Sequence, residues 1–380
     1  MLVIIIISSI LTVAYALLML LYRAGWAQVP VFVIPPVYEP YTLVSIIIPA
    51  RNEAANIGAC INSLLAQKYP LQLLEIIVVD DHSTDNTINV VKGYKADNIR
   101  CISLADYLPS KGRITAFKKA ALAAGISQSK GTLIITTDAD CIAPDTWLIN
   151  IVALYEIEQP EMIVAPVIYS SDNSIIQIFQ LTDFMSMQGI TAAAHVIKLG
   201  NMCNGANLAF RKMTFEEVNG YQDISHLASG DDYLLMMKIN KRFPGGIAYL
   251  KSENVIMSTS PQPDWGNFFQ QRIRWASKSG KYNDSRLTAI LILVYLYNII
   301  ILVLAAGCFF RPVLLWLLLV ALLVKIITEY IFLIPVAQFF RQERVLKYFP
   351  FLQPLHILYI VLAGFMGFMG GYKWKGRAVK

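Results

Sequence analysis

The sequence predicts an α/β domain flanked by transmembrane helices, and two observations carry this prediction. The chain has 380 residues, of which 56% are hydrophobic and only 15% charged, with a mean hydropathy of +0.51. A single soluble domain is not this apolar. Long apolar stretches lie near both ends, whereas residues 40–282 have ordinary soluble character and alternate between strand-like and helix-like segments.

The first apolar stretch, residues 2–22, is predicted to be an anchor at residues 1–23 rather than a cleaved signal. It lacks a basic n-region and a clear cleavage site. Arg23 follows it directly, which favours a cytosolic location for the downstream domain.

Three further stretches, residues 287–310, 312–339 and 350–371, are long enough to span a bilayer and predict a membrane domain of about three helices at residues 287–372. Lys325 and Glu329 are four apart and can pair on one helix face. Pro354, His356 and several glycines leave a tilted or partly re-entrant last segment open. Three full crossings would place the basic tail "KWKGRAVK" outside, against the positive-inside tendency, so either that segment is re-entrant, one stretch does not span, or the tendency fails.

The compartment is constrained by cysteine content and charge. Five cysteines form no CxxC pair, which is typical of a reducing compartment, and together with the anchors this predicts an integral protein of a bacterial inner membrane. A protein of a eukaryotic Golgi or ER membrane would have a similar sequence pattern and is the alternative. A net charge of +6 without a basic-aromatic pattern indicates contact with anionic membrane lipids and no nucleic-acid partner.

The domain's elements follow from its apolar runs. Residues 43–49, 74–80, 99–104 and 133–137 are predicted strands, and residues 52–67, 84–94 and 114–124 are predicted helices. Continuous apolar strands that alternate with helices predict a mostly parallel sheet covered on both faces.

Polar residues collect where three of these strands end. "PARNE" follows the first strand, "DDHSTDNT" the second and "DAD" the fourth. Each group can cap the helix that follows, but ligands of open parallel sheets bind beyond the carboxyl ends of the strands, so three such loops predict a shared ligand site.

The absence of two phosphate-binding motifs limits how the site can bind a nucleotide. Neither GxGxxG nor GxxxxGK[ST] is present, so no glycine-rich loop holds phosphate. Asp138 and Asp140 repel each other at the end of a buried strand, and a divalent Mg²⁺ or Mn²⁺ ion would offset that repulsion and bind a diphosphate.

Five motifs together resemble one family. "VSIIIPARNEAANI", "IIVVDDHSTDNT", "IITTDADC", "SGDDYLLMMKI" and "QQRIRW" occur in the order found in family 2 inverting glycosyltransferases with a GT-A fold. The layout is similar to the membrane-embedded branch that includes bacterial polysaccharide synthases and ceramide glucosyltransferases. The motifs cover residues 44–275.

The resemblance implies roles for residues at the sheet's edge. Ala50 and Glu53 would line the nucleotide pocket, Asp80 would contact a uracil ring, Asp138 would lie on the ribose side and Asp140 would bind the metal. Lys111 falls where the family has a basic loop near the nucleotide, although the usual KxxALN form is not kept in "KGRITAFKKAAL". A solvated loop lysine is the alternative for Lys111.

The chemical step is assigned to "GDDY". The family usually reads Glu-Asp here, so Asp232 would be the base and Asp231 would replace the glutamate. Asp231 is the alternative base, and capping of a helix that starts near Tyr233 is the structural alternative for both.

"QQRIRW" and "NGANLAF" would serve the acceptor or diphosphate. The resemblance gives these roles to Gln271, Arg274, Trp275 and Asn204. An amphipathic helix at the bilayer surface is compatible with the first motif, and a plain turn explains the second.

The sequence therefore predicts a membrane-bound inverting glycosyltransferase that moves a sugar from a nucleotide sugar, of the UDP class, to a lipid or lipid-linked acceptor. A processive polysaccharide synthase, which would extrude a glycan acceptor, is the alternative within the family. A membrane transporter or receptor with a nucleotide-sensing domain is the alternative of another class.

Overall fold

The structure is a computed structural model that describes residues 2–108, 116–171, 174–200, 202–224, 227, 230–278, 284–369, 372–374 and 377–379, the last two segments by backbone alone. The chain forms two compact units. We call Pro30–Tyr169 with Met202–Ser260 the sheet unit, and Met1–Val29, Ser170–Asn201 and Pro261–Lys380 the helical unit.

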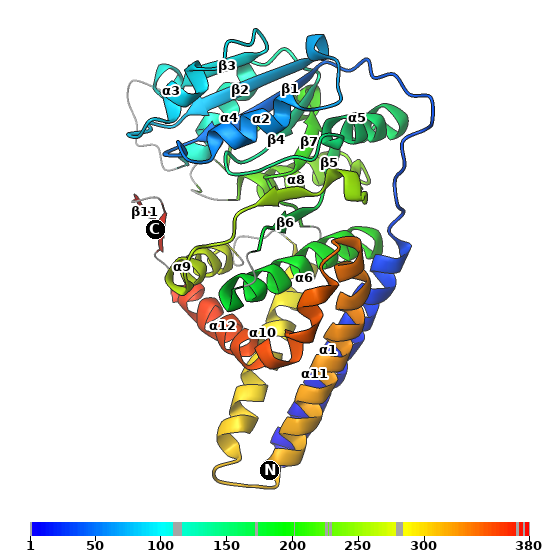
Figure 1. Cartoon of the computed structure of the whole chain (residues 1–380). Helices are drawn as coiled ribbons and strands as arrows, with labels where there is room; N and C mark the ends of the chain where they lie inside the picture. The colour runs from blue at the N-terminus through cyan, green and yellow to red at the C-terminus, as the bar shows by residue number, and fades with distance from the viewer. Residues whose placement is uncertain are drawn as a thin grey trace. The chain divides into compact units, whose positions relative to one another are not determined.

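The sheet unit is built on seven strands in the order β3-β2-β1-β4-β7-β5-β8 (Figure 1). The strands are β1 Val44–Ala50, β2 Leu74–Asp80, β3 Ile99–Ser103, β4 Leu133–Thr136, β5 Met162–Val164, β7 Leu208–Arg211 and β8 Ile247–Tyr249. The four predicted strands are confirmed as the parallel β1–β4. Only β7 runs antiparallel to its neighbours in this sheet, β4 and β5, and β5 is parallel to β8. Outside this sheet, β6 Val167–Tyr169 pairs with β9 Met257–Thr259.

The strands form because their apolar runs are covered on both faces. Every residue of β2 is buried, and β1 is buried except at Pro49. The alanine-rich α4 lies very close to these strands: a Cβ at Gly125 would lie 2.5 Å from Ile47 Cγ2. Small side chains in "AALAAG" therefore let this helix approach the sheet, as the fold of a buried parallel sheet requires.

The helices of the sheet unit are α2 Ile57–Leu65, α3 Thr87–Lys92, α4 Phe117–Ser127, α5 Trp147–Glu158, α7 Lys212–Glu217 and α8 Asp231–Arg242, with the 3-10 turns η1 Leu71–Leu73, η2 Leu104–Tyr107 and η3 Glu253–Val255. The first helix begins at Ile57, not at residue 52 as predicted, and the second at Thr87, not 84. Both starts are delayed because the preceding loops bond to each other, as described below.

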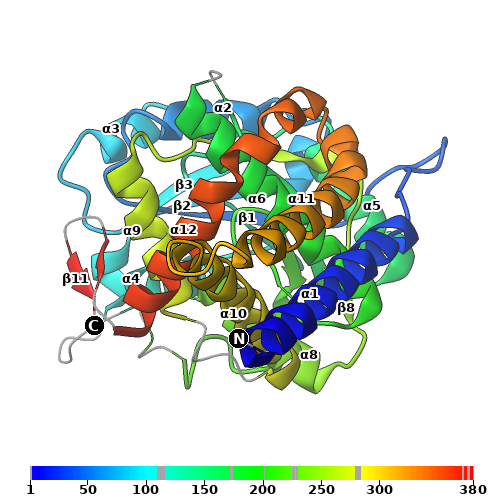
Figure 2. The same ribbon diagram turned by 90° about the horizontal axis from the view of Figure 1, so that it is seen from below.

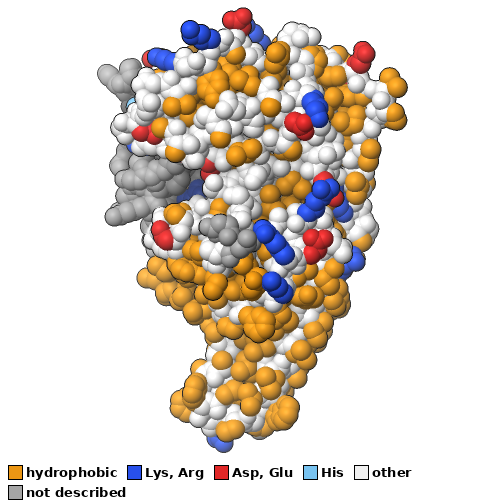
Figure 3. Space-filling view, in the orientation of Figure 1, with side chains coloured by type: hydrophobic (Ala, Val, Ile, Leu, Met, Phe, Trp, Pro, Cys, Tyr) orange, Lys and Arg blue, Asp and Glu red, His pale blue; other side chains and the backbone are white. Residues whose placement is uncertain are grey.

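The helical unit contains α1 Leu2–Gln28, α6 Ile175–Ile197, α9 Trp265–Ala276, α10 Ser285–Gly307, α11 Leu314–Phe339, the 3-10 turn η5 Glu343–Lys347, α12 Phe349–Met369 and the hairpin β10 Tyr372–Trp374 with β11 Arg377–Val379. Within the described ranges, α1, α10, α11 and α12 are long and apolar enough to cross a membrane. The lower part of Figure 3, where α1, α10 and α11 lie, is covered by hydrophobic side chains. A chain with such helices is a membrane protein.

The four candidate membrane helices, α1, α10, α11 and α12, do not all run in the same direction. Figure 2 shows α1 beside α11, whereas Figure 1 shows α12 running obliquely to both, and α12 packs against α9 and α10. The predicted pairing of Lys325 with Glu329 is confirmed inside this bundle. Glu329 also accepts hydrogen bonds from Tyr15 and, at 2.7 Å, from Gln353 Nε2. A buried charge needs such partners, so this cluster fixes how α1, α11 and α12 pack.

Candidate active site

The loops after β1 and β2 are bonded together at the carboxyl edge of the sheet. Asn52 and His82 both have positive φ, 53° and 55°. The Asn52 N–H donates to Ser83 Oγ at 3.0 Å, and Asn52 Oδ1 accepts from the Thr84 N–H at 2.8 Å. Asn and His tolerate the left-handed region better than most residues, so these side chains suit a tight pair of loops.

Ala50, Glu53 and Asp80, three of the residues predicted to contact the nucleotide, meet at this edge. Ala50 and Asp80 are register partners in β1 and β2. Asp80 is buried, and its carboxylate accepts from the Ser83 N–H at 3.3–3.4 Å. The Glu53 N–H donates to Thr87 Oγ1 at 2.8 Å. The carboxylates are not helix caps, because the N-cap residues of α2 and α3 are Asn56 and Asn86.

Asp138 and Asp140 follow β4 on either side of the buried Ala139, and both side chains are partly exposed. Beneath them lie two buried cysteines: Cys60 Sγ donates to the Asp138 carbonyl at 3.7 Å, and Cys141 Sγ lies 3.8 Å from Asp140 Oδ1. Burial, followed by the Asp140 and Asp138 carboxylates, raises the pKa of Cys60 to about 12. Cys60 is therefore a neutral thiol at neutral pH and adds no charge to the "DAD" loop.

A lysine that the sequence analysis did not single out neutralises part of this charge. Lys118, in the first turn of α4, places Nζ 2.6 Å from Asp138 Oδ1 and 3.5 Å from Asp231 Oδ2. Burial alone would lower the pKa of Lys118, but Asp138, Asp231 and Asp232 raise it well above its ordinary value. Lys118 is therefore a permanent cation that joins the "DAD" loop to the "GDDY" motif.

The spacing of the chain contained a signal for Lys118. Ala121 and Leu122 follow it by three and four residues, which is the KxxAL part of the KxxALN form that is not kept at Lys111. Lys111 itself lies outside the described residues.

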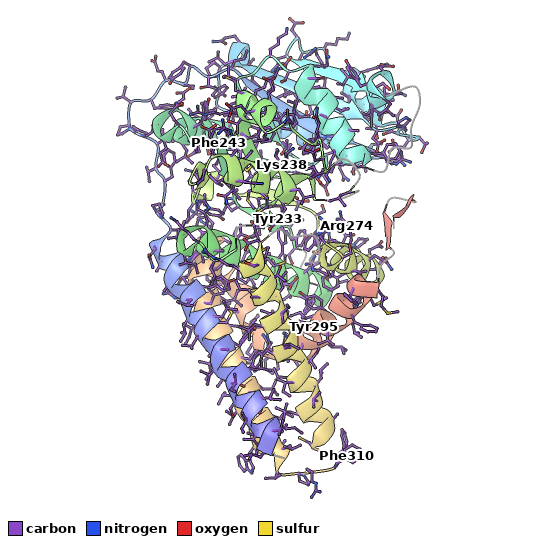
Figure 4. The ribbon with its side chains drawn as sticks, turned by 180° about the vertical axis from the view of Figure 1, so that it is seen from behind. Tyr233, Lys238, Phe243, Arg274, Tyr295 and Phe310 are labelled. Atoms are coloured by element: carbon purple, nitrogen blue, oxygen red, sulfur yellow. The ribbon has the colours of Figure 1, made fainter. Side chains whose placement is uncertain are left out.

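Asp231 and Asp232 begin α8, and neither is its N-cap, because Gly230 occupies that position with φ 81°. Asp232 nevertheless bonds an N–H in the first turn of α8, so a structural role at the start of this helix stays the alternative to catalysis. Asp231 is buried beside Lys118, whereas Asp232 is partly exposed. Figure 4 labels Tyr233, the residue that follows Asp232 on α8. Asp232 Oδ1 accepts from the Tyr233 N–H at 2.7 Å.

A turn before β7 holds the second oxygen of Asp232. The Gly205 N–H donates to Asp232 Oδ2 at 3.1 Å, and the Gly205 carbonyl accepts from Thr136 Oγ1 at 3.0 Å. Asn204 Oδ1 accepts from the Ala206 N–H at 3.0 Å and so stabilises the turn itself. The end of β4, this turn and the start of α8 thus orient Asp232 together.

The predicted Gln271, Arg274 and Trp275 belong to the helical unit, on α9, where Figure 4 labels Arg274. Gln271 Oε1 accepts from Arg272 Nη1 at 2.7 Å, and the Trp275 ring lies 4.3 Å from the Arg272 guanidinium carbon. The structure brings the other described site residues together in the sheet unit.

The sheet unit's carboxylates suit a ligand that brings a cation with it. Among the described residues, no three His, Cys, Asp or Glu side chains are grouped to hold a metal by themselves. Asp138 and Asp140 offer hard oxygen ligands, which match Mg²⁺ or Mn²⁺, and a diphosphate can supply the remaining ones. The residues present therefore fit a cation that is completed by substrate.

Comparison with known proteins agrees with this arrangement. The profile of glycosyl transferase family 2 matches residues 45–218, and that of glycosyl transferase family group 2 matches residues 133–367. Glycosyltransferase AglE of Haloferax volcanii is 29% identical over 191 residues, 50% of this chain and 58% of that protein. Undecaprenyl-phosphate 4-deoxy-4-formamido-L-arabinose transferase of Serratia proteamaculans is 31% identical over 119 residues, 31% of this chain and 35% of that protein.

The chain spans a little over half the length of the first curated relatives, 53–58%. Among solved structures, mannosyltransferase PcManGT from Pyrobaculum calidifontis, in complex with GDP-Man and Mn²⁺, is similar with a TM-score of 0.62 and 18% identity. That likeness covers 93% of this chain and 99% of that one and shows a shared GT-A fold. The chain belongs to glycosyl transferase family group 2 and has the GT-A fold, and its described residues include four helices that are long and apolar enough to cross a membrane.

Proposed function

We propose that the protein transfers a sugar, with inversion, from a UDP-sugar to a lipid or lipid-linked acceptor in a bacterial inner membrane. The observation that carries this proposal is the set of carboxylates at the carboxyl edge of the sheet, where Lys118 joins Asp138 to Asp231 and Asp232 lies beside them. A binding module for nucleotides would not require a second pair of carboxylates opposite the "DAD" loop. The enzyme family likewise disfavours the transporter or receptor alternative.

The donor's nucleotide would bind at the two interlocked loops. Ala50 and Glu53 would line the pocket, and the Asp80 carboxylate would accept a hydrogen bond from the base while Asp138 lies on the ribose side. A mannosyltransferase of the same fold is solved with a nucleotide sugar, GDP-Man, which supports this class of donor. For a uracil base, as the family resemblance implies, the Asp80 carboxylate would accept from the ring N–H.

Asp140, together with the "DAD" backbone, would hold a divalent cation, Mg²⁺ or Mn²⁺. Such a cation supplies positive charge to a diphosphate leaving group. Mn²⁺ in the PcManGT complex supports a divalent metal in this fold. Lys118 keeps Asp138 in place and offsets part of the carboxylate charge, so that the site can accept the anionic donor.

Asp232 would act as the base. As the acceptor hydroxyl oxygen attacks the anomeric carbon, its proton passes to the Asp232 carboxylate and the sugar–diphosphate bond breaks. Asp232 is the better candidate than Asp231 because it is partly exposed, whereas Asp231 is buried beside Lys118. The N–H groups of Gly205 and Tyr233 orient Asp232 and leave lone pairs for the acceptor's proton.

The acceptor is proposed to be a lipid because four helices in the described part of the chain are apolar and long enough to cross a membrane. A relative named as an undecaprenyl-phosphate transferase supports a lipid acceptor. Gln271, Arg274 and Trp275 would contact the acceptor or the diphosphate, since arginine binds diphosphate and tryptophan can stack on a sugar ring. Asn204 would shape the acceptor pocket through the turn that it stabilises.

The test uses membranes that contain the parent, Asp140→Asn or Asp232→Asn, with a panel of radiolabelled nucleotide sugars and with or without Mg²⁺ or Mn²⁺. Asp145→Asn is the matched control, because Asp145 lies in the same unit but forms an exposed pair with Lys68. We expect metal-dependent label in the organic phase that both site variants lose and the control keeps. Label in an ethanol-insoluble polymer would instead establish the processive synthase. Absence of transfer from every donor, with UDP still bound, would contradict the proposal.

A further inference from the structure

The helical unit contains a buried arginine next to the QxxRW residues that the proposed chemistry does not use. Arg272 on α9 is 4% exposed. Its guanidinium lies between two rings of the same helix, 4.6 Å from the centre of Phe268 and 4.3 Å from that of Trp275. Arginine's flat guanidinium suits such stacking, which a lysine cannot reproduce.

Asp183 on α6 is the partner of this arginine. Arg272 Nε and Nη2 both donate to Asp183 Oδ2, at 3.0 and 2.7 Å. The other oxygen, Oδ1, accepts from the Tyr359 hydroxyl of α12 and lies 3.5 Å from His356 Nε2. Burial alone would raise the pKa of Asp183, but Arg272 and His356 hold it below its usual range. Three helices, α6, α9 and α12, therefore meet at one ionised carboxylate.

The same guanidinium reaches two of the three QxxRW side chains. Its remaining nitrogen, Nη1, donates to Gln271 Oε1 at 2.7 Å, and its face lies against Trp275. A rotation of Arg272 would thus change the direction of Gln271 and the support of Trp275 together. Asp183 opposes that rotation, because Nε and Nη2 of Arg272 both donate to its Oδ2 and a rotated guanidinium would lose these bonds.

The packing of α6, α9 and α12 does not by itself require this ion pair. Directly beside it, Phe179, Phe268, Ile273, Tyr359 and Ala363 form an apolar cluster between the same helices. Replacement of a buried ion pair by apolar side chains is often neutral or stabilising, so helix docking could be achieved without charges. What the ion pair adds, and an apolar pair does not, is a fixed direction for Gln271 and Trp275.

We propose that Asp183 is a positioning residue that acts through Arg272 to hold Gln271 and Trp275 in the orientation needed for sugar transfer. The proposal rests on the function proposed above for the QxxRW residues. Tyr359 and His356 extend the contact to α12, so this candidate membrane helix contributes to the same orientation.

The test separates positioning from stability in the full chain, reconstituted in lipid nanodiscs. Asp183→Asn leaves Arg272 without a countercharge, whereas the pair Asp183→Leu/Arg272→Met removes both charges. Thr182→Val is the matched control: Thr182 is equally buried on α6, but its hydroxyl donates to the Ile178 carbonyl of its own helix and not to α9 or α12 as far as these are described. Transfer kinetics, melting temperature and hydrogen exchange of residues 265–276 are measured for each.

We expect exchange in α9 to accelerate in Asp183→Asn and kcat for transfer to fall about 10- to 100-fold, because small misplacement of a positioning group costs about this much. The apolar pair should recover the parent's melting temperature but not its kcat. In a Gln271→Ala background, the additional fold-loss in kcat caused by the Asp183→Leu/Arg272→Met double variant should be at least about threefold smaller, because part of its effect passes through Gln271. Thr182→Val should match the parent.

Three results would overturn the proposal: unchanged exchange in α9, recovery of kcat together with stability in the apolar pair, or an undiminished loss in the Gln271→Ala background. A Gln271→Ala variant as active as the parent would refute the role of QxxRW and this inference with it, while leaving the carboxylate chemistry intact. A parent that transfers no sugar would refute the proposed function, and hydrogen exchange would still decide whether Asp183 holds α9.

Discussion

Replacement of Lys118 by methionine tests the charge arrangement of the site most sharply. The change keeps the length and apolar part of the side chain but removes the ammonium that lies 2.6 Å from Asp138 Oδ1 and 3.5 Å from Asp231 Oδ2. Three carboxylates, Asp138, Asp231 and Asp232, then lose the cation that acts on all of them.

The expected magnitude follows from burial. A hydrogen bond between charged groups contributes about 1.5–3 kcal/mol. The side chains of Lys118 and Asp138 are 25% and 38% exposed, so solvent screening reduces this to about 1–2 kcal/mol of folding stability. The loss in transfer should be larger, about 100-fold or more, because Asp138 and Asp231 shift away from their working positions.

Lys68→Met is the matched control. Lys68 makes an ion pair of similar length, 2.7 Å to Asp145, but both side chains are more than half exposed. Its removal should change stability by less than about 0.5 kcal/mol and leave transfer unchanged. Both variants are measured by thermal unfolding and by initial rates of label transfer. A Lys118→Met variant that retains more than about a third of the parent's rate would refute the reasoning.

Three further predictions concern the rest of the chain. Lys325→Met leaves Glu329 buried without its cation, and the free energy of unfolding, measured in SDS, should fall by about 3–5 kcal/mol. A loss below about 1 kcal/mol would show that the hydrogen bonds from Tyr15 and Gln353 are sufficient to stabilise the buried Glu329. Burial raises the pKa of Glu75, but its bonds with Ser45, Lys130 and Arg100 lower that pKa by more. Glu75 therefore stabilises the fold above a pH of about 4.5, and this contribution disappears as the pH falls through the lowered pKa. In Glu75→Gln the melting temperature should depend less steeply on pH below about 5, and an unchanged slope would contradict this. Because α12 runs obliquely to α1, α10 and α11 (Figure 1), we predict that α1, α10 and α11 cross the membrane and α12 does not. A cysteine introduced at Lys380 should then react with an impermeant maleimide from the cytosolic side. Reaction only from the outside would show that α12 also crosses the membrane.

The sequence was a good guide to the sheet edge because the relevant signals are local. Buried parallel strands read as continuous apolar runs, and their ends are marked by an abrupt change to Asp, Asn and Ser. That is why β1, β2 and β4 and the polar groups after them were predicted, with Asp80 and Asp138 at the ends of the two strands that flank β1.

Long-range contacts decided what the sequence analysis missed. The first helix starts late because Asn52 bonds to Ser83 and Thr84, residues 31 and 32 positions away. Lys118 has the KxxAL spacing, but its contact with a carboxylate 20 positions away on another element cannot be read from that spacing. The ion pair of Arg272 with Asp183, 89 positions apart, is hidden for the same reason. Burial of charged side chains cannot be read from local periodicity.

The assignment of Asp232 as the base is the centre of the account, and a paired measurement of binding and rate tests it directly. The dissociation constant of the UDP-sugar with metal and the single-turnover rate of transfer are measured for the parent, Asp231→Asn and Asp232→Asn. We predict that Asp232→Asn binds the donor as the parent does but transfers about 10²- to 10⁴-fold more slowly, the usual contribution of a general base. An Asp232→Asn rate within tenfold of the parent's, with Asp231→Asn inactive but still able to bind donor, would contradict the account and make Asp231 the base.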